Sequence, residues 1–333
     1  MKILLATDGS RYSGEAVRLL RSLASDRSYQ VDLVAVVPET GADAGAGAGS
    51  GRSSVTGSVT GSEARVFTPD ASSAAPPPAR PRIEDQVSDK VASGWLHKAA
   101  AELEAVGIDV STEIVRGVPE EALVERCRTG TYDLIVAGVK GRGAAPFFEV
   151  GRVARHLLQW APVSVLLVRP RAVRSRDAAP RSSSESAGFR VLLPTDGNPG
   201  SLEASWRMLD SLTPSGTGIE VVRVVEPSHA RTAIPAGEAT WSGGSGEARE
   251  PARRWSSSDP EGPAGPGRRA ARQEGTILRG RPAAAIARWA SWNHSDLVVL
   301  GLRKPDGADP CLLGPTAREL TWSSPCSVLM VRS

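Results

Sequence analysis

The feature that most constrains this chain is an internal repeat. The segment YDLIVAGVKGRG, followed by GRVARHLLQWAPVSVLLVRP at 151–170, matches SDLVVLGLRKPDG, followed by GPTARELTWSSPCSVLMVRS at 314–333. Three pairs of matched positions share one offset of 163 (301 minus 138), namely Gly138 with Gly301, Gly151 with Gly314, and Arg169 with Arg332. A chain of 333 residues has room for about two domains, so the repeat predicts two copies of one unit.

The beginning of the unit repeats as well, but at a different offset. KILLATDGS at residue 2 pairs with RVLLPTDGN at residue 190, so the second copy is 25 residues shorter in its middle (188 minus 163). Between Glu226 and Gly275 there is no counterpart of the amphipathic helix predicted over 84–106. We therefore expect one face of the second sheet to be thinly covered, either by a partner or by the insertion, with Trp241 and Trp255 as candidate covering side chains.

Each copy alternates short apolar runs with helical patterns. KILLAT is typical of a buried strand, and in the segment that follows Ala16, Leu20 and Leu23 lie at helical spacing. Alternation of this kind indicates a parallel sheet with helices on both faces, joined by right-handed crossovers. The sequence therefore predicts an α/β fold made of two tandem doubly wound parallel sheets, the second lacking one helix.

Low-complexity stretches divide the chain further. Residues 39–82 and 227–267 are dominated by Gly, Ala, Ser and Pro, and lack the apolar periodicity that would offset the entropy of ordering them. We predict that both are disordered insertions. Residues 171–188 have the same character and are predicted to be a linker between a first domain at 1–170 and a second, partly degenerate domain at 189–333.

Composition argues against several classes of protein. The net charge of +3 is too small to indicate a nucleic-acid surface, and no run of about 18 apolar residues suggests a membrane span. The N-terminus MKILLATDGS enters a strand pattern directly, so we expect a cytoplasmic protein. Cys127, Cys311 and Cys326 lack metal-ligand spacing and are predicted to be small buried hydrophobic residues. No activated nucleophile, paired carboxylates or metal cluster is visible, so we assign no catalysis.

A glycine loop follows the fourth strand of the first copy. Ligands of doubly wound sheets bind beyond the carboxyl ends of the strands, where the strand order reverses. Gly138 and Gly141 allow the backbone to turn and approach a ligand, and Gly151 begins a helix whose free N–H groups favour phosphate. The spacing therefore predicts a phosphate cradle. It is a poor dinucleotide fingerprint, and no G-x-x-x-x-G-K-[ST] loop occurs.

These motifs together resemble one known family. The opening TDGSRYSGEA, the spacing Gly138-x-x-Gly141-(nine residues)-Gly151 and the closing strand VSVLLVR are similar to the universal stress protein family in its tandem form. The resemblance implies five-stranded sheets in the order 3-2-1-4-5, of the adenine nucleotide alpha hydrolase-like type, with frequent dimerisation through the last strand. In one branch it also implies ATP, with which Mg²⁺ can bind, at the pattern G-2x-G-9x-G-[ST].

The resemblance assigns a nucleotide site in the first copy to seven residues: Thr7 and Val36 along the base, Asp8 at the ribose and adenine end, Gly138, Gly141 and Gly151 around ribose and phosphates, and Arg152 after the last glycine. Arg152 stands where the ATP-binding branch has Ser or Thr. This long cation could reach phosphate, fill the cavity or point to solvent. Lys140 and Arg142 flank the site and would add positive charge.

The second copy keeps only part of this pattern. Its weaker candidate site consists of Asp196, Val224, Gly301, Gly314 and Thr316. Lys304 replaces the middle glycine, and Pro315 removes an N–H donor that would face phosphate. The alternative for this copy is a pseudo-domain retained for packing. In both copies, Asp8 and Asp196 could instead only cap a helix or order a turn.

Two functional hypotheses follow from different classes. The first is a stress-response protein that binds ATP in its first half and acts through conformation or partner affinity. The second is a nucleotide-independent interaction protein whose copies form an internal pseudo-dimer, supported by Arg152, the degraded second loop and the apolar strands VSVLLV and CSVLM, which would otherwise be open edges. Pairing with a second chain stays open. A PP-loop ATPase would need an S-G-G-x-D-S turn that is absent.

Overall fold

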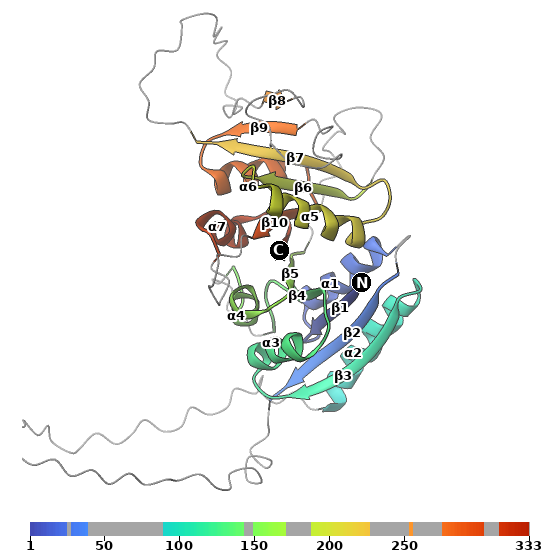
Figure 1. The fold of residues 1–333 in the computed structure, drawn as a ribbon. Coiled ribbons are helices and arrows are strands. Elements are labelled where there is room, and N and C mark those ends of the chain that lie inside the picture. The colour runs from blue at the N-terminus through green and yellow to red at the C-terminus, as the bar shows by residue number, and fades with distance from the viewer. Residues whose placement is uncertain are drawn as a thin grey trace, which may run out of the picture.

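One continuous sheet runs through the molecule, with helices on both of its faces (Figure 1). The structure is a computed structural model, and it describes residues 1–24, 28–38, 89–142, 149–170, 188–226, 253–255, 275–302 and 313–332. The insertion predicted at 39–82 and the linker predicted at 171–188 lie outside these ranges, except for Gly188.

The elements follow the predicted alternation. The first copy contains β1 (Lys2–Thr7), α1 (Arg11–Leu23), β2 (Gln30–Val37), α2 (Asp89–Glu104), β3 (Asp109–Arg116), α3 (Pro119–Thr129), β4 (Leu134–Gly138), α4 (Arg152–Trp160) and β5 (Ser164–Val168). The second copy contains β6 (Arg190–Thr195), α5 (Pro199–Leu212), β7 (Gly218–Val225), β8 (Arg253–Trp255), β9 (Gly275–Arg279), α6 (Pro282–Trp292), β10 (Leu297–Leu302), α7 (Pro315–Ser323) and β11 (Ser327–Arg332).

The strand order confirms the predicted topology in both copies. The whole sheet has the order β3-β2-β1-β4-β5-β11-β10-β6-β7-β9-β8. Within each copy the five repeated strands are parallel and lie in the order 3-2-1-4-5, counted along that copy. The two sheets are not separate, however, because β5 pairs with β11 in an antiparallel manner and joins them. An internal pair of copies is therefore built around the last strand of each.

The junction between the copies has approximate twofold symmetry. Leu166 pairs with Leu329, and these are equivalent positions at the offset of 163 (329 minus 166). On either side, Leu167 pairs with Val328 and Val165 with Met330. A strand that meets its own equivalent in this way makes an isologous contact, as in a twofold dimer. The junction also covers two apolar edges that would otherwise be open to other chains.

Two equivalent arginines extend this symmetry to the helices. The guanidinium of Arg332 donates to the carbonyl of Leu158, near the end of α4, at 2.8 Å. The guanidinium of Arg169 donates to the carbonyls of Thr321 and Trp322, in the last turn of α7. Cations are favourable at the carboxyl ends of helices, where carbonyls lack helical partners. Each copy therefore caps a helix of the other.

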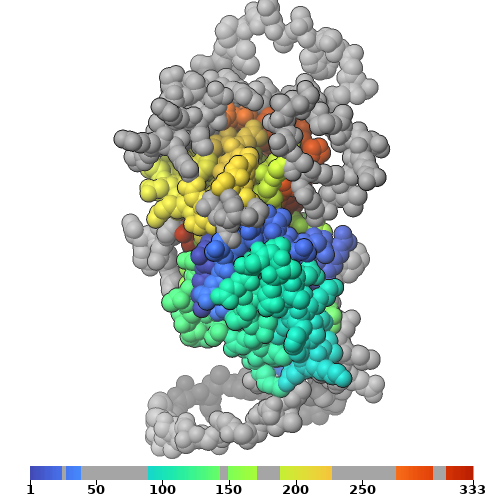
Figure 2. Space-filling view, turned by 90° about the vertical axis from the view of Figure 1, so that its right-hand side faces the viewer, coloured from blue at the N-terminus to red at the C-terminus, as the bar shows by residue number. Residues whose placement is uncertain are grey.

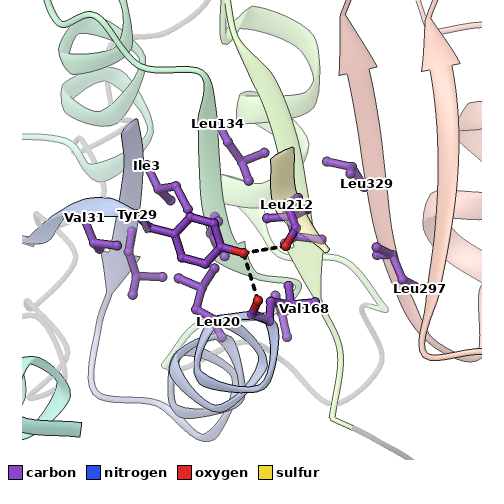
Figure 3. Packing of buried hydrophobic residues seen from close by; sticks show 14 of the residues in the cluster. Ile3, Leu20, Tyr29, Val31, Leu134, Val168, Leu212, Leu297 and Leu329 are labelled. Atoms are coloured by element: carbon purple, nitrogen blue, oxygen red, sulfur yellow. Dashed lines mark hydrogen bonds between the residues drawn. The ribbon is translucent and has the colours of Figure 1, made fainter. Parts of the chain in front are cut away.

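The hydrophobic core is divided by the sheet into two clusters, each shared by both copies. One packs under α1, α2 and α5, the other under α3, α4, α6 and α7. Figure 3 shows Tyr29 inside the first cluster, beside Ile3. Its hydroxyl donates to the carbonyl of Leu23 at 3.0 Å and to that of Leu212, in the other copy, at 2.6 Å. A buried hydroxyl thus links the two copies.

Among the described residues the second copy has no counterpart of α2, and most of the stretch between β7 and β9 lies outside them. Figure 2 shows α2 forming much of the surface of the first copy on one side. Within 227–267, which we predicted to be disordered, Arg253–Trp255 instead form β8 along β9. The free backbone groups of the β9 edge offer hydrogen-bond partners that composition does not reveal. Trp255 pairs with Gly275 through the backbone, and Trp241 lies outside the described residues.

A buried carboxylate, Asp32, lies near the amino ends of the strands of the first copy. Asp32 accepts hydrogen bonds from the Tyr132 hydroxyl at 2.6 Å and from the Ser111 hydroxyl at 2.7 Å, and the Lys2 ammonium lies 3.2 Å away. Burial alone would raise the pKa of Asp32, but these contacts outweigh it and hold the pKa below its ordinary value. Burial, followed by the hydrogen bond to Asp32, raises the pKa of Tyr132 to about 12.

No helix in the described ranges is long and apolar enough to cross a membrane.

Candidate functional site

The candidate site lies at the carboxyl ends of β1 and β4, where the strand order of the first copy reverses. From these strands the chain continues into α1 and α4, which pack on opposite faces of the sheet. The turn after β1 and the loop after β4 therefore meet at the carboxyl edge of the sheet. The loop is described as far as Arg142 and again from Glu149.

Asp8 connects the turn to the loop. Its Oδ1 accepts a hydrogen bond from the Ser10 amide at 3.0 Å, which orders the turn before α1. Its Oδ2 accepts one from the Arg142 amide at 2.6 Å. Thr7 is buried beside it, and the Thr7 hydroxyl accepts from the Gly9 amide at 3.4 Å. The predicted turn-ordering role of Asp8 is thus present, together with a second contact that fixes the glycine loop.

The three glycines of the loop have different surroundings. A Cβ on Gly138 would lie 2.6 Å from the Cβ of Tyr12, so this glycine is required where α1 packs against β4. A Cβ on Gly141 would lie 2.9 Å from Asp8 Oδ2, so this glycine lets the loop approach the carboxylate. Gly151 is the N-cap of α4, and its amide donates to the Val139 carbonyl at 2.8 Å. The structure therefore brings Asp8, Gly141 and Gly151 together.

The remaining predicted residues of the first copy flank this group. Thr7 pairs with Ala35 across β1 and β2, so Val36 follows directly at the end of the neighbouring strand. Val36 is half-buried and packs against the core cluster that lies under α3 and α4. Lys140 is half-buried in the loop.

Arg152 turns toward the neighbouring helix. Its Nε lies 2.9 Å from Oε1 of Glu120, which belongs to the first turn of α3. The sequence left three possibilities for Arg152, namely contact with phosphate, filling of the cavity or exposure to solvent. An ion pair with Glu120 was not one of them. Sequence reasoning missed Glu120 because a carboxylate near the start of a helix is ordinary, and only the tertiary packing of α3 beside α4 reveals its partner.

Trp95, which belongs to α2 and was not among the predicted site residues, lies against the site. Gly9 has a positive φ of 69°, and a Cβ there would lie 2.4 Å from the Trp95 indole. The Arg142 guanidinium stacks 4.3 Å from the centre of the same ring system, a cation–π contact. Trp95 thus packs on both the turn and the loop. The available sequence signal was its position in a helix pattern that has no counterpart in the sequence of the second copy.

The corresponding region of the second copy is built less completely. Asp196 is exposed and orders its turn by accepting from the Asn198 amide at 2.9 Å. Among the described residues nothing lies within 4 Å of a Cβ placed on Gly314, and Pro315 occupies the first position of α7. Val224 and Thr316 are half-buried, and Gly301 packs closely on Ser201 of α5. Lys304 lies outside the described residues.

Metal and thiol chemistry find little support in the described ranges. There, no group of three or more His, Cys, Asp and Glu residues could hold a metal ion. Cys127 and Cys326 are buried, and burial raises the pKa of Cys127 to about 12 and that of Cys326 to about 11. Both thiols therefore behave as apolar side chains, and Cys311 lies outside the described residues.

Comparisons with known proteins agree with this architecture. A 61-residue stretch is 36% identical to the "Universal stress protein in QAH/OAS sulfhydrylase 3'region" of Thermus aquaticus. It spans 18% of this chain and 44% of that relative, which is less than half of the relative's length.

Two solved structures share the fold over nearly the whole chain. A universal stress protein from Archaeoglobus fulgidus DSM 4304 has a TM-score of 0.53 at 16% identity, covering 99% of this chain and 98% of its own. A functionally unknown protein from Pseudomonas aeruginosa PAO1 has a TM-score of 0.53 at 14% identity, covering 99% of this chain and 92% of its own. At such identities the similarity establishes the fold alone.

The sequence pattern of the universal stress protein family matches twice, over residues 1–169 and 189–332. These ranges contain the two repeated copies, the joined sheets and both sets of candidate site residues. This chain therefore belongs to the universal stress protein family.

Proposed function

We propose that this chain is a cytoplasmic stress-response protein whose first copy binds ATP, with Mg²⁺ accompanying the phosphates. Nucleotide binding would change the conformation of the glycine loop and, through it, the affinity for a partner. We also propose that residues 1–170 and 189–333 are the two domains and that 171–188 join them. No catalytic role is assigned to any residue.

The observation that carries the proposal is the contact between Asp8 and the glycine loop. Asp8 Oδ2 binds the Arg142 amide, and Gly141 leaves no room there for a side chain. The loop is thus held over the amino end of α4, where free N–H groups and the helix dipole favour phosphate. Gly141 is needed because a Cβ would meet the Asp8 carboxylate. The absence of a side chain here also leaves the backbone open to a ligand, which supports the proposed site.

The proposed roles follow the order of the strand ends. Thr7 and Val36 would contact the base, Asp8 the ribose and adenine end, and Gly138, Gly141 and Gly151 the ribose and phosphates. Arg152, at the first position of α4, would contact phosphate. The second copy, with Asp196, Val224, Gly301, Gly314 and Thr316, is proposed to bind nucleotide weakly or not at all, because Pro315 removes a donor at the start of α7.

The decisive test is calorimetric titration of ATP and Mg²⁺ into the full chain, its Asp8→Ala variant and its Asp196→Ala variant. The two substitutions are matched, because each removes a carboxylate that orders the turn after an equivalent strand. We expect one equivalent of ATP to bind the unchanged chain. Binding should be lost in Asp8→Ala and retained in Asp196→Ala.

A second function is favoured by a separate observation, the symmetrical junction at Leu166 and Leu329. It would be an interaction protein that needs no nucleotide and whose pseudo-dimer presents a surface to a partner. Absence of binding heat for ATP, ADP and AMP, with no nucleotide carried through purification, would select this alternative and reject the nucleotide site.

A further inference from the structure

Arg152 and Glu120 connect the amino ends of two helices. Arg152 is the first residue of α4, immediately after Gly151, and Glu120 is the second residue of α3. Both helices begin at the carboxyl edge of the sheet, and they pack beside each other. Their amino ends are electropositive, so together with Arg152 they form a region that favours anions. Glu120 is the carboxylate within it.

Glu120 is unusually enclosed for a charged residue. Only 8% of it is exposed, and its Oε1 lies 2.9 Å from Arg152 Nε. Its Oε2 is buried and, as far as the described residues show, has no hydrogen-bond partner. If Arg152 moved away, the buried carboxylate would lose its cation, and an unpaired buried charge is strongly unfavourable. The burial of Glu120 therefore keeps Arg152 in place.

Arg152 itself stays accessible. About 72% of its side chain is exposed, although its Nε contacts Glu120. The closest contact uses the inner nitrogen of the guanidinium, so a ligand can still approach the two terminal nitrogens. Because a guanidinium is a rigid planar fork, fixing one nitrogen also fixes the direction of the other two. Arg152 is thus a cation with a set orientation beside the amino end of α4.

Both members of the pair are missing from the second copy. The offset of 163 places Ala283 opposite Glu120 (283 minus 120) and Pro315 opposite Arg152 (315 minus 152). The copy that lacks the arginine therefore also lacks the carboxylate that would hold it. An ion pair at these two positions is not required by the fold, because α6 and α7 pack together with Ala283 and Pro315 there and are linked elsewhere, by Arg281 and Glu319 at 3.7 Å.

We propose that Glu120 is a positioning residue, which holds Arg152 so that its guanidinium binds the outer phosphates of the nucleotide in the first copy. The inference rests on the proposed function and deepens it. It assigns to one ion pair the preference for ATP over nucleotides with fewer phosphates. The guanidinium of Arg152 then contacts phosphate at the position where the ATP-binding pattern has a Ser or Thr hydroxyl. The base and ribose contacts do not depend on this pair.

The test is titration of AMP, ADP and ATP into the full chain and four variants. Glu120→Gln should weaken ATP binding about tenfold and leave AMP binding unchanged, since a charge-assisted contact to the outer phosphates is lost. Arg152→Lys should behave similarly, because lysine keeps the charge but has no fork. The double variant should bind ATP no more weakly than either single variant, which is the signature of two residues acting as one unit.

Glu121→Gln is the matched control, because Glu121 is exposed in the same helical turn and its removal changes the net charge equally.

Several outcomes would overturn the inference. Glu120→Gln could raise the affinity for ATP, which would make the carboxylate an electrostatic opponent of phosphate. It could also change AMP and ATP equally, or have no more effect than Glu121→Gln. Unfolding midpoints of all variants would show whether a general loss of stability causes the effect. If the unchanged chain binds none of the three nucleotides, the proposed function itself fails, which is a different result from a failure of the pair.

Discussion

The two copies of the repeat differ in which of their glycines are needed, and why. Gly138 and Gly301 occur in both copies, and a Cβ at either position would collide with the helix that follows the first strand, at Tyr12 in one copy and Ser201 in the other. Gly141 has no glycine counterpart, and its Cβ would meet Asp8. The repeated glycine thus reflects the packing of the fold. The unrepeated glycine reflects the candidate site.

The same distinction applies to the rest of the site. Trp95 packs on the turn and loop of the first copy from α2, a helix with no described counterpart in the second. Glu120 and Arg152 are replaced by Ala283 and Pro315. These three side chains of the first copy, Trp95, Glu120 and Arg152, lie around the carboxyl ends of β1 and β4, whereas the glycine shared at Gly138 and Gly301 serves the packing of the sheet.

Among the features shared by both copies, the junction should cause the largest loss in the free energy of unfolding when it is changed. Leu166 and Leu329 are fully buried, equivalent and paired with each other. Leu166→Ala and Leu329→Ala should each lower the free energy of unfolding by about 2–5 kcal/mol, because each leaves a cavity in the same core. Urea denaturation of both variants would measure this, with the exposed Val91→Ala as a control. A loss confined to one of the two leucines would contradict the symmetry.

Asp32 provides a contrast between the copies. Its equivalent is Glu220, which is half-buried and accepts from the Thr276 hydroxyl at 3.0 Å. Asp32→Asn should cost about 1.5–3 kcal/mol of stability at neutral pH, because it weakens charged hydrogen bonds, and Glu220→Gln should cost less. Unfolding measured at pH 7 in both variants would compare them.

The pH dependence of this cluster has a definite sign. The pKa of Asp32 is lowered in the folded state, so its contribution is present above the unfolded pKa of about 3.9 and is lost as pH falls through the folded pKa. Tyr132 has a folded pKa of about 12, against about 10 when unfolded. The unfolded chain therefore loses this proton first, and stability falls as pH rises from about 10 toward 12. Tyr132→Phe should remove the alkaline part of the decline.

Alanine substitution of the glycines would test the comparison directly. Gly138→Ala and Gly301→Ala should each reduce stability by about 1–3 kcal/mol, because the added methyl group overpacks α1 or α5. Gly314→Ala should cost less, since Gly314 is exposed and no described residue lies within 4 Å of the added carbon. Denaturant midpoints of the three variants would give the ranking. An equal cost at Gly314 would show that the surroundings of these glycines do not decide their role.

Tyr29 should give the smallest of these effects. Its hydroxyl links Leu23 and Leu212, whereas its equivalent, Thr217, donates locally to the Pro214 carbonyl at 2.8 Å. Tyr29→Phe should cost about 1 kcal/mol, because it leaves a buried carbonyl in the other copy without this donor. Thermal unfolding would measure the change. An unchanged midpoint would mean that the contact between the copies is carried by apolar packing alone.

Much of the fold was predictable from the sequence. The repeat predicted two units, the alternation of KILLAT-like strands with amphipathic helices predicted parallel sheets, and the resemblance predicted the strand order. Strand β8 was not predictable, because Arg253–Trp255 gain their strand conformation from the edge of β9 and not from their own pattern. Local propensity cannot report a partner that is distant in the sequence.

The candidate site was predicted in outline. Asp8, Gly141 and Gly151 come together because the strand order of a doubly wound sheet places these loops at one edge. The sequence did not reveal why a glycine is needed at position 138, because its close contact with Tyr12 depends on how α1 packs. Glu120 and Trp95 were missed for the same reason. Their partners are set by the packing of helices on the sheet, which residue spacing does not encode.

The antiparallel pairing of β5 and β11 also determines how this protein can associate with its relatives. Each of these strands is already paired within the chain, so backbone pairing of a second molecule at the same edge would require the internal pairing to open. Because both partners lie in one polypeptide, they meet at a fixed effective concentration, whatever the amount of protein in the cell. The second copy is therefore always present beside the first, and it completes the sheet whether or not it binds a ligand.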